Sequence, residues 1–161
     1  MRRNGSRTPT IEIYGALDPS IPALLATRSV GDVIRLNGVV SAETTRQAQH
    51  QASALLSLSW ESPRDYTNLP AKLFEYAAAK RPVLHLGRVE TLGTRLIADH
   101  RLGFVADPSD AATVAKLVQA IVDGETPWVA PPTESLRPLS QSAMLDGFRA
   151  VIERVFSDVS G

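Results

Sequence analysis

The chain of 161 residues contains no cysteine. Disulfide bonds, thiolate nucleophiles and thiolate metal sites are therefore excluded, and a reducing compartment suits the sequence. Lysine plus arginine equals aspartate plus glutamate at 17 each, so there is no basic excess to neutralise a nucleic-acid backbone. The sequence also lacks any apolar run that approaches the roughly 20 residues needed to span a bilayer. These absences favour a globular protein whose partner is neither nucleic acid nor the interior of a membrane.

Hydrophobic residues make up 43% of the chain, enough for one domain with a substantial core. Strand-like and helix-like segments alternate along residues 10–124. Strands are predicted at 10–14, 33–36, 54–59, 82–86 and 103–106. Helices are predicted at 21–26, 42–52, 70–81, 94–100 and 111–122. This alternation predicts an α/β fold, with a parallel sheet covered by helices on both faces.

The two ends of the chain differ from this pattern. Residues 1–9 are expected to form a disordered lead or a truncated linker. Four prolines over 125–138 predict an extended connector. Over 139–161 a C-terminal helix is predicted, because apolar residues recur there with helical spacing. The predicted domains are thus an α/β unit at 10–124, a connector and one last helix.

The most informative segment is residues 69–86, which is typical of a loop, a short helix, a turn and a buried strand. Pro70 suits the first turn of the helix, and Asn68 before it is a plausible cap. Lys72 and Glu75 lie three residues apart on one side of this helix. A helix N-terminus with a nearby lysine favours phosphate, and a carboxylate one turn deeper can accept hydrogen bonds from ribose hydroxyls. A nucleoside diphosphate fits this arrangement.

The run Pro70-Ala71-Lys72-Leu73-Phe74-Glu75-Tyr76, the small-residue helix after it and Pro82-Val83-Leu84 together resemble the donor-binding signature of GT-B glycosyltransferases, in particular the group-1 family. The upstream segment 32–41 is similar to the family's strand and Gly-Val turn. The resemblance covers residues 10–122. It implies the Rossmann-like C-terminal half of a GT-B fold, apparently without its first strand and without the N-terminal acceptor domain.

The resemblance implies a set of donor-binding residues after the helix start. Glu75 is expected to bind the ribose, the alternative being an exposed glutamate paired with Lys72 or Lys80. Lys72 is expected near the diphosphate, the alternative being a solvated lysine. Thr67 and Asn68 are expected to cradle the phosphates together with backbone N–H groups, or to act as caps. Many relatives carry a glutamate at the position of Thr67, so the donor sugar stays open.

Three glycine-turn residues and one arginine complete the predicted site. Gly38 and Val40 match the turn that seats the nucleotide base in relatives, and otherwise form a simple turn. Gly15 permits a close approach of the backbone, or is an ordinary turn glycine. Arg64 lies in a polar-aromatic loop and is able to offset diphosphate charge.

The implied activity is transfer of a sugar from a UDP-, GDP- or ADP-sugar to a hydroxyl of a glycan or lipid-linked saccharide, with retention of configuration. Neither a metal nor another cofactor is expected, and the catalytic residues are unknown. The expected partners are the donor and an acceptor domain, on the same or a neighbouring chain. The expected place is the cytoplasm, at the inner face of the membrane. Alone, the chain is expected to bind nucleotide weakly and to transfer nothing.

Other functions remain open from the sequence. A nucleotide-sugar epimerase of the same fold is one, although it usually needs more histidines and carboxylates than this chain offers. A non-catalytic Rossmann-like interaction module is another. A phosphoacceptor receiver domain is disfavoured, because acidic residues are missing after the first and third strands. His85 is interpreted as a core or rim histidine with satisfied hydrogen bonds, and His50 and His100 as surface residues.

Overall fold

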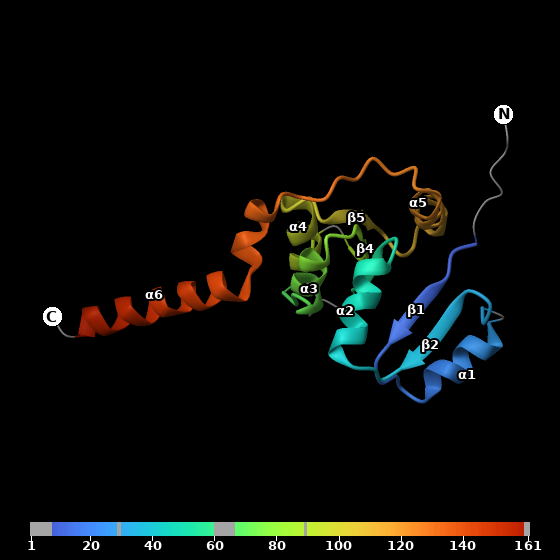
Figure 1. Cartoon of the computed structure of the whole chain (residues 1–161), viewed down its shortest axis with the longest axis horizontal. Coiled ribbons are helices and arrows are strands. Elements are labelled where there is room, and N and C mark those ends of the chain that lie inside the picture. The colour runs from blue at the N-terminus through green and yellow to red at the C-terminus, as the bar shows by residue number, and fades with distance from the viewer. Residues whose placement is uncertain (1–7, 29, 60–66, 89, 160–161) are drawn as a thin grey trace.

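A computed structural model describes residues 8–28, 30–59, 67–88 and 90–159 (Figure 1). The strands are β1 (Ile11–Tyr14), β2 (Ile34–Gly38), β3 (Leu55–Leu58), β4 (Val83–Leu86) and β5 (Gly103–Ala106). The helices are α1 (Ser20–Thr27), α2 (Ala42–Gln51), α3 (Lys72–Ala79), α4 (Leu92–Asp99), α5 (Ala111–Asp123) and α6 (Gln141–Val159), with a 3₁₀ helix, η2, at Thr133–Leu139. Strands and helices alternate up to α5, so the predicted α/β class is confirmed.

The strands are parallel, but they form two sheets instead of the single sheet predicted. One sheet has the order β1-β2 and the other the order β3-β4-β5. In the larger sheet Ser57, His85 and Val105 are register partners, so their side chains lie on one face. Parallel strands joined through helices and flanked by helices are consistent with a Rossmann-like fold. The sequence could not reveal the division, because strand pairing depends on contacts between distant segments.

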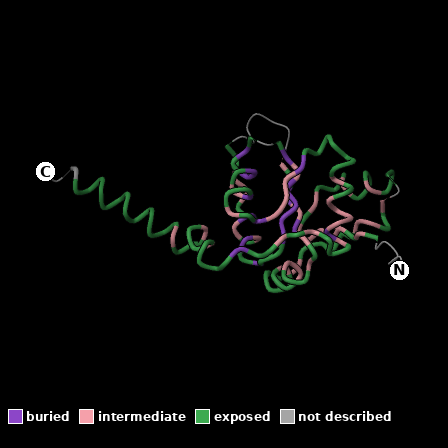
Figure 2. Tube along the Cα trace, turned by 90° about the horizontal axis from the view of Figure 1, so that it is seen from above, coloured by how far each residue is buried: buried purple, intermediate pink, exposed green. Residues whose placement is uncertain are grey.

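The core lies between β4 and the two helices that flank it in sequence. Its buried cluster consists of Leu73, Ala77, Val83, Ile97 and Leu102, contributed by α3, β4, α4 and the turn before β5. Residues 82–85 are all buried, which confirms the prediction of a strand covered on both faces. Figure 2 shows that buried residues gather in this part of the chain and that α6 is almost entirely exposed.

Helix ends follow the local sequence closely where a cap is available. Asp110 caps α5 by accepting a hydrogen bond from the Thr113 N–H at 3.0 Å, and Gly124 ends it in the left-handed region at φ 73°. Helix α4 begins at Leu92, two residues before the predicted start, because Thr91 is its cap. Helix α3 begins at Lys72 and not at Pro70. Its cap position is Ala71, so the prediction that Asn68 caps this helix is wrong.

The segment predicted as an extended connector is partly helical. Residues 133–139 form η2, whose Leu136 and Leu139 pack against the core cluster. The Lys80 ammonium donates to the Thr133 hydroxyl at 2.6 Å. Apolar burial and this hydrogen bond fold the proline-rich segment back on the α/β unit. Helix α6 then projects away from the rest of the chain in both views (Figures 1 and 2).

Candidate functional site

The candidate site lies at the carboxyl ends of the strands, where ligands bind in open α/β folds. Gly15 and Gly38 stand at these ends in the β1-β2 sheet. Ser59, Gly87 and Asp107 follow the strands of the larger sheet. The residues predicted from sequence therefore fall into two groups, a glycine turn after β1 and β2 and the start of α3 after β3.

The structure brings Gly15 and Gly38 together. The Gly15 N–H donates to the Gly38 carbonyl at 2.7 Å. Both residues have positive φ, 118° and 68°, and a Cβ at either would meet nothing within 4 Å. Backbone conformation, and not crowding, therefore requires glycine at both positions. No close contact at Gly15 requires the absence of a Cβ, so its positive φ agrees with the alternative of a turn glycine.

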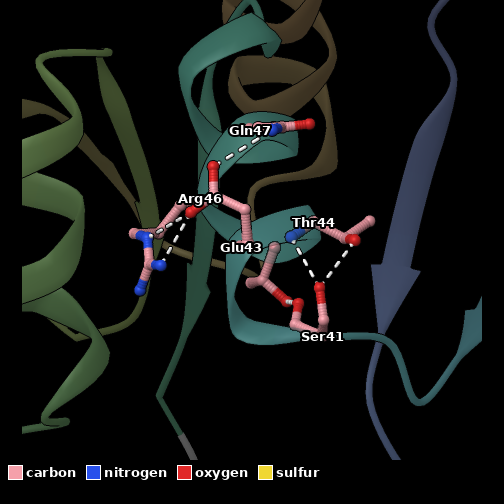
Figure 3. Close-up of polar contacts among 6 residues, drawn as sticks. Ser41, Glu43, Thr44, Arg46 and Gln47 are labelled. Atoms are coloured by element: carbon pink, nitrogen blue, oxygen red, sulfur yellow. Dashed lines mark hydrogen bonds and ion pairs between the residues drawn. The ribbon is translucent and has the colours of Figure 1, made fainter.

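The glycine turn leads through the half-buried Val40 into a capped helix. Ser41 Oγ accepts a hydrogen bond from the Thr44 N–H at 3.0 Å, as Figure 3 shows. Glu43 receives hydrogen bonds from Arg46 and Gln47, and these bonds lower the pKa of its carboxyl group. The Ser41 side chain thus satisfies one of the N–H groups of the first turn of α2.

Lys72 and Glu75 are both exposed at the start of α3, and they lie on one side of the helix as the sequence predicts. Leu73 and Ala77 on the opposite side are buried, and Leu73 is fully so. The first turn is tight, because the Leu73 N–H donates to the Pro70 carbonyl and the Phe74 N–H to the Ala71 carbonyl. Burial of Leu73 and Ala77 therefore fixes the orientation of α3, and with it the side that carries Lys72 and Glu75.

The remaining predicted residues lie before α3. Thr67 and Asn68 are exposed. Arg64 lies outside the described residues. Among the described residues no ion pair joins Glu75 to Lys72 or to Lys80.

His85 is the residue whose importance the sequence interpretation underestimates. Its side chain is fully buried, and its Nε2 is hydrogen-bonded to Ser59 Oγ at 3.1 Å. Burial, followed by the positive charge of Lys72, lowers the pKa of the His85 imidazole. The charge of Lys72 thus contributes to the lowered pKa of His85, near the carboxyl end of β4, although the Lys72 side chain is exposed. The expectation that His85 is a buried histidine is correct.

The expectation that His85 has satisfied hydrogen bonds is wrong. Its Nδ1 and the Oγ of Ser57 are buried without a hydrogen-bond partner among the described residues. Ser57 is the register partner of His85 in the neighbouring strand. A histidine one residue before the end of a buried strand is a weak sequence signal, and the serine partners become visible only once the strands are paired.

The loop after β4 packs closely on this histidine. A Cβ at Gly87 would lie 2.8 Å from His85 Nε2 and 2.9 Å from the Ser59 Cβ.

Thr91 caps α4 by accepting from the Thr94 N–H at 3.1 Å, and the Thr94 hydroxyl donates to the Arg88 carbonyl. Ser109 hydrogen bonds, and then the charge of Arg88, lower the pKa of Asp107. Arg88 is thus a second cation at the carboxyl edge, and the sequence analysis misses it.

Stability is expected to fall as the pH drops below about 6.5, the ordinary pKa of histidine. Burial lowers the folded-state pKa of His85, so the unfolded chain takes up this proton first. The free energy of unfolding should fall by at most about 1.4 kcal/mol per pH unit, and this fall ends below the folded-state pKa of His85. Urea unfolding between about pH 8 and about pH 5 measures it, and in His85→Gln the slope over this interval should shrink. An equal slope in both proteins would contradict the assignment to His85.

Within the ranges that the structure describes, no three histidine, aspartate or glutamate side chains are grouped closely enough to hold a metal ion. Among the described helices, none combines the length and the apolar character needed to cross a membrane. The chemistry that the described edge does offer is cationic and polar, from Lys72, Arg88 and helix N-termini.

A scan against protein-family models finds no match to this chain. Comparison with curated proteins and with solved structures finds no match either. Function must therefore be argued from the residues and the geometry.

Proposed function

We propose that the chain is the donor-binding domain of a glycosyltransferase of the GT-B type and binds a nucleoside-diphosphate sugar. One observation carries the proposal. Lys72 and Glu75 are exposed together at the start of α3, the helix that follows β3 in the chain. The helix N-terminus and Lys72 suit the diphosphate of the ligand. Glu75, which follows them along the helix, suits the ribose that follows the diphosphate.

Each group has a distinct role in this proposal. The α3 N-terminus and Lys72 stabilise the diphosphate, with Thr67 and Asn68 beside it. Glu75 accepts hydrogen bonds from the ribose hydroxyls. The turn formed by Gly38 and Val40 receives the base through main-chain atoms, and Gly15 holds this turn through its hydrogen bond. As the diphosphate leaves during transfer, the same positive groups stabilise the developing charge without a metal ion.

The rest of the proposal concerns the complete enzyme. An acceptor domain supplies the hydroxyl acceptor and any catalytic base, and transfer retains the anomeric configuration. The complete enzyme acts in the cytoplasm at the inner face of the membrane, and its acceptor is a glycan or a lipid-linked saccharide. The present chain orients the donor and contributes electrostatics, so that alone it binds nucleotide and transfers nothing.

A non-catalytic interaction module is the second candidate function. The observation that favours it is the exposed apolar side of α6, which a purely ligand-binding domain does not require. The epimerase alternative has less support, because His85, a candidate proton-transfer group, is fully buried. Nucleotide binding separates the two remaining candidates.

Glu75→Gln is expected to weaken UDP, GDP or ADP binding about tenfold or more, because the ribose hydroxyls lose a charged acceptor. The same variant should bind inorganic pyrophosphate, which has no ribose, as the unaltered protein does. Lys72→Met should weaken both ligands, since both carry the diphosphate charge. Isothermal titration calorimetry measures all these affinities.

Glu125→Gln is a matched control, because Glu125 is also an exposed glutamate, after α5 and far along the chain from α3. Its nucleotide affinity should not change. Equal nucleotide affinities for the Glu75 variant, the control and the unaltered protein would remove Glu75 from the site. Failure of all three to bind any of the nucleotides would remove the proposed function.

A further inference from the structure

Three polar side chains lie on one face of the larger sheet and lead toward its carboxyl edge. Ser57 lies on β3 and Ser59 directly follows this strand, two residues on, so the two share a face. His85 on β4 is the register partner of Ser57. Ser57 and His85 are fully buried, whereas Ser59 is half-buried. Of these three residues, only Ser59 has exposed surface that a ligand at the carboxyl edge can touch.

The position of the proton on the His85 imidazole decides what Ser59 can offer to a ligand. Burial lowers the pKa of His85, so the imidazole is neutral at about pH 8 and carries one N–H. A proton on Nδ1 would be a buried donor without an acceptor among the described residues. A proton on Nε2 is donated to Ser59 Oγ, 3.1 Å away, and leaves Nδ1 as an unpaired acceptor. Among backbone groups a buried N–H without an acceptor is rarer than an under-satisfied carbonyl, and the same preference favours the proton on Nε2.

Two glycines bring positive groups close to this hydrogen bond. A Cβ at Gly87 would lie 3.0 Å from Ser59 Oγ, so the loop that continues into Arg88 lies against the serine. A Cβ at Gly93 would lie 3.6 Å from His85 Nε2, so the first turn of α4 lies beside the histidine. A helix N-terminus carries a partial positive charge. The surroundings of Ser59 therefore favour an anion.

We propose that the Ser59 hydroxyl donates a hydrogen bond to a phosphate of the bound nucleoside diphosphate, and that His85 positions this hydroxyl by donating from Nε2 to Ser59 Oγ. The inference rests on the proposed function and adds a residue to its diphosphate site. The charge of Lys72, the cation proposed for that site, contributes to the lowered pKa of His85. Because Ser59 Oγ accepts from His85, its own O–H is left to donate to a phosphate oxygen.

Ser59→Ala is expected to weaken binding of inorganic pyrophosphate and of UDP, GDP or ADP about tenfold, because one hydrogen bond to a charged group is lost. Ser57→Ala is the matched control. It removes the same hydroxyl from the same face of the sheet, two residues further from the carboxyl edge, and its affinities should not change. Isothermal titration calorimetry on the full chain measures the affinities, and the thermal midpoints check that both variants fold.

The affinities distinguish this inference from the proposed function. Suppose that the unaltered protein binds these ligands and that Lys72→Met weakens binding. An unchanged affinity in Ser59→Ala would then remove Ser59 from the site and leave the proposed function standing. Absence of binding of pyrophosphate and of all three nucleotides to the unaltered protein would overturn both.

The role of His85 as a positioning residue has a spectroscopic test that needs no nucleotide. Long-range ¹H–¹⁵N NMR at about pH 8 shows which ring nitrogen is protonated, and the signals lost in His85→Gln identify this histidine among the three in the chain. The proton should be on Nε2, and a proton on Nδ1 would contradict the proposal. Saturating pyrophosphate should shift the Nε2 signal in the unaltered protein and not in Ser59→Ala. An equal shift in both proteins would show that the anion does not act through Ser59.

Discussion

Gly103→Ala is expected to destabilise the protein by about 4 kcal/mol or more, an unusually large effect for the addition of one methyl group. Gly103 opens β5 and is the register partner of Val83 in the central strand. A Cβ at this position would lie 2.0 Å from the Val83 carbonyl oxygen and 2.4 Å from the Val83 backbone nitrogen. Backbone atoms cannot rotate away as a side chain can, so β5 must separate from β4.

Urea unfolding followed by circular dichroism measures this loss. Gly31→Ala is the control, because a Cβ at Gly31 meets nothing within 4 Å and its φ is not in the left-handed region. The control should be within about 0.5 kcal/mol of the unaltered protein. A Gly103→Ala protein as stable as this control would show that β5 does not pair with β4 as described. Loss of this pairing would also displace Asp107 from the carboxyl edge.

Leu73→Ala is expected to cost about 3 to 5 kcal/mol. Leu73 is fully buried in the core cluster and is the residue through which α3 packs against β4 and α4. Truncation removes apolar contacts and leaves a cavity beneath the helix that carries Lys72 and Glu75. The thermal midpoint should fall by about 10 °C.

Leu24→Ala is a matched control for this substitution. Leu24 also lies in a helix of eight residues, but it is 50% exposed. Its replacement should cost less than about 1 kcal/mol. If the two variants were equally stable, the assignment of the core to the α3–β4–α4 contact would be wrong.

The residues of the predicted donor site illustrate how far sequence reasoning reaches. The position of Lys72 and Glu75 on one side of α3 could be predicted, because it follows from helical spacing around buried neighbours. The contact between Gly15 and Gly38 could not, since it joins the ends of two strands that are 23 positions apart. The hydrogen bond between Ser59 and His85 joins residues 26 positions apart and was missed for the same reason.

Local sequence also misjudged some element ends and the proline-rich connector. Asn68 is chemically suited to cap a helix, but the turn at Pro70 places Ala71 at the cap position of α3. The prolines after residue 125 predict an extended chain. Packing of Leu136 and Leu139 on the core cluster nevertheless folds residues 133–139 into η2. In both cases tertiary contacts outweighed a local preference.

The sequence by itself determined the alternation of strands and helices, the buried character of β4 and the ends of α5. These properties depend on capping residues and apolar spacing within one or two turns of chain. Only the tertiary structure decided that the strands form two sheets, that the His85 imidazole is half satisfied beside two serines, and that the apolar side of α6 faces solvent. These properties depend on contacts between segments that are far apart in the sequence. The free energy of such contacts depends on both segments together, so it cannot be predicted from either one alone.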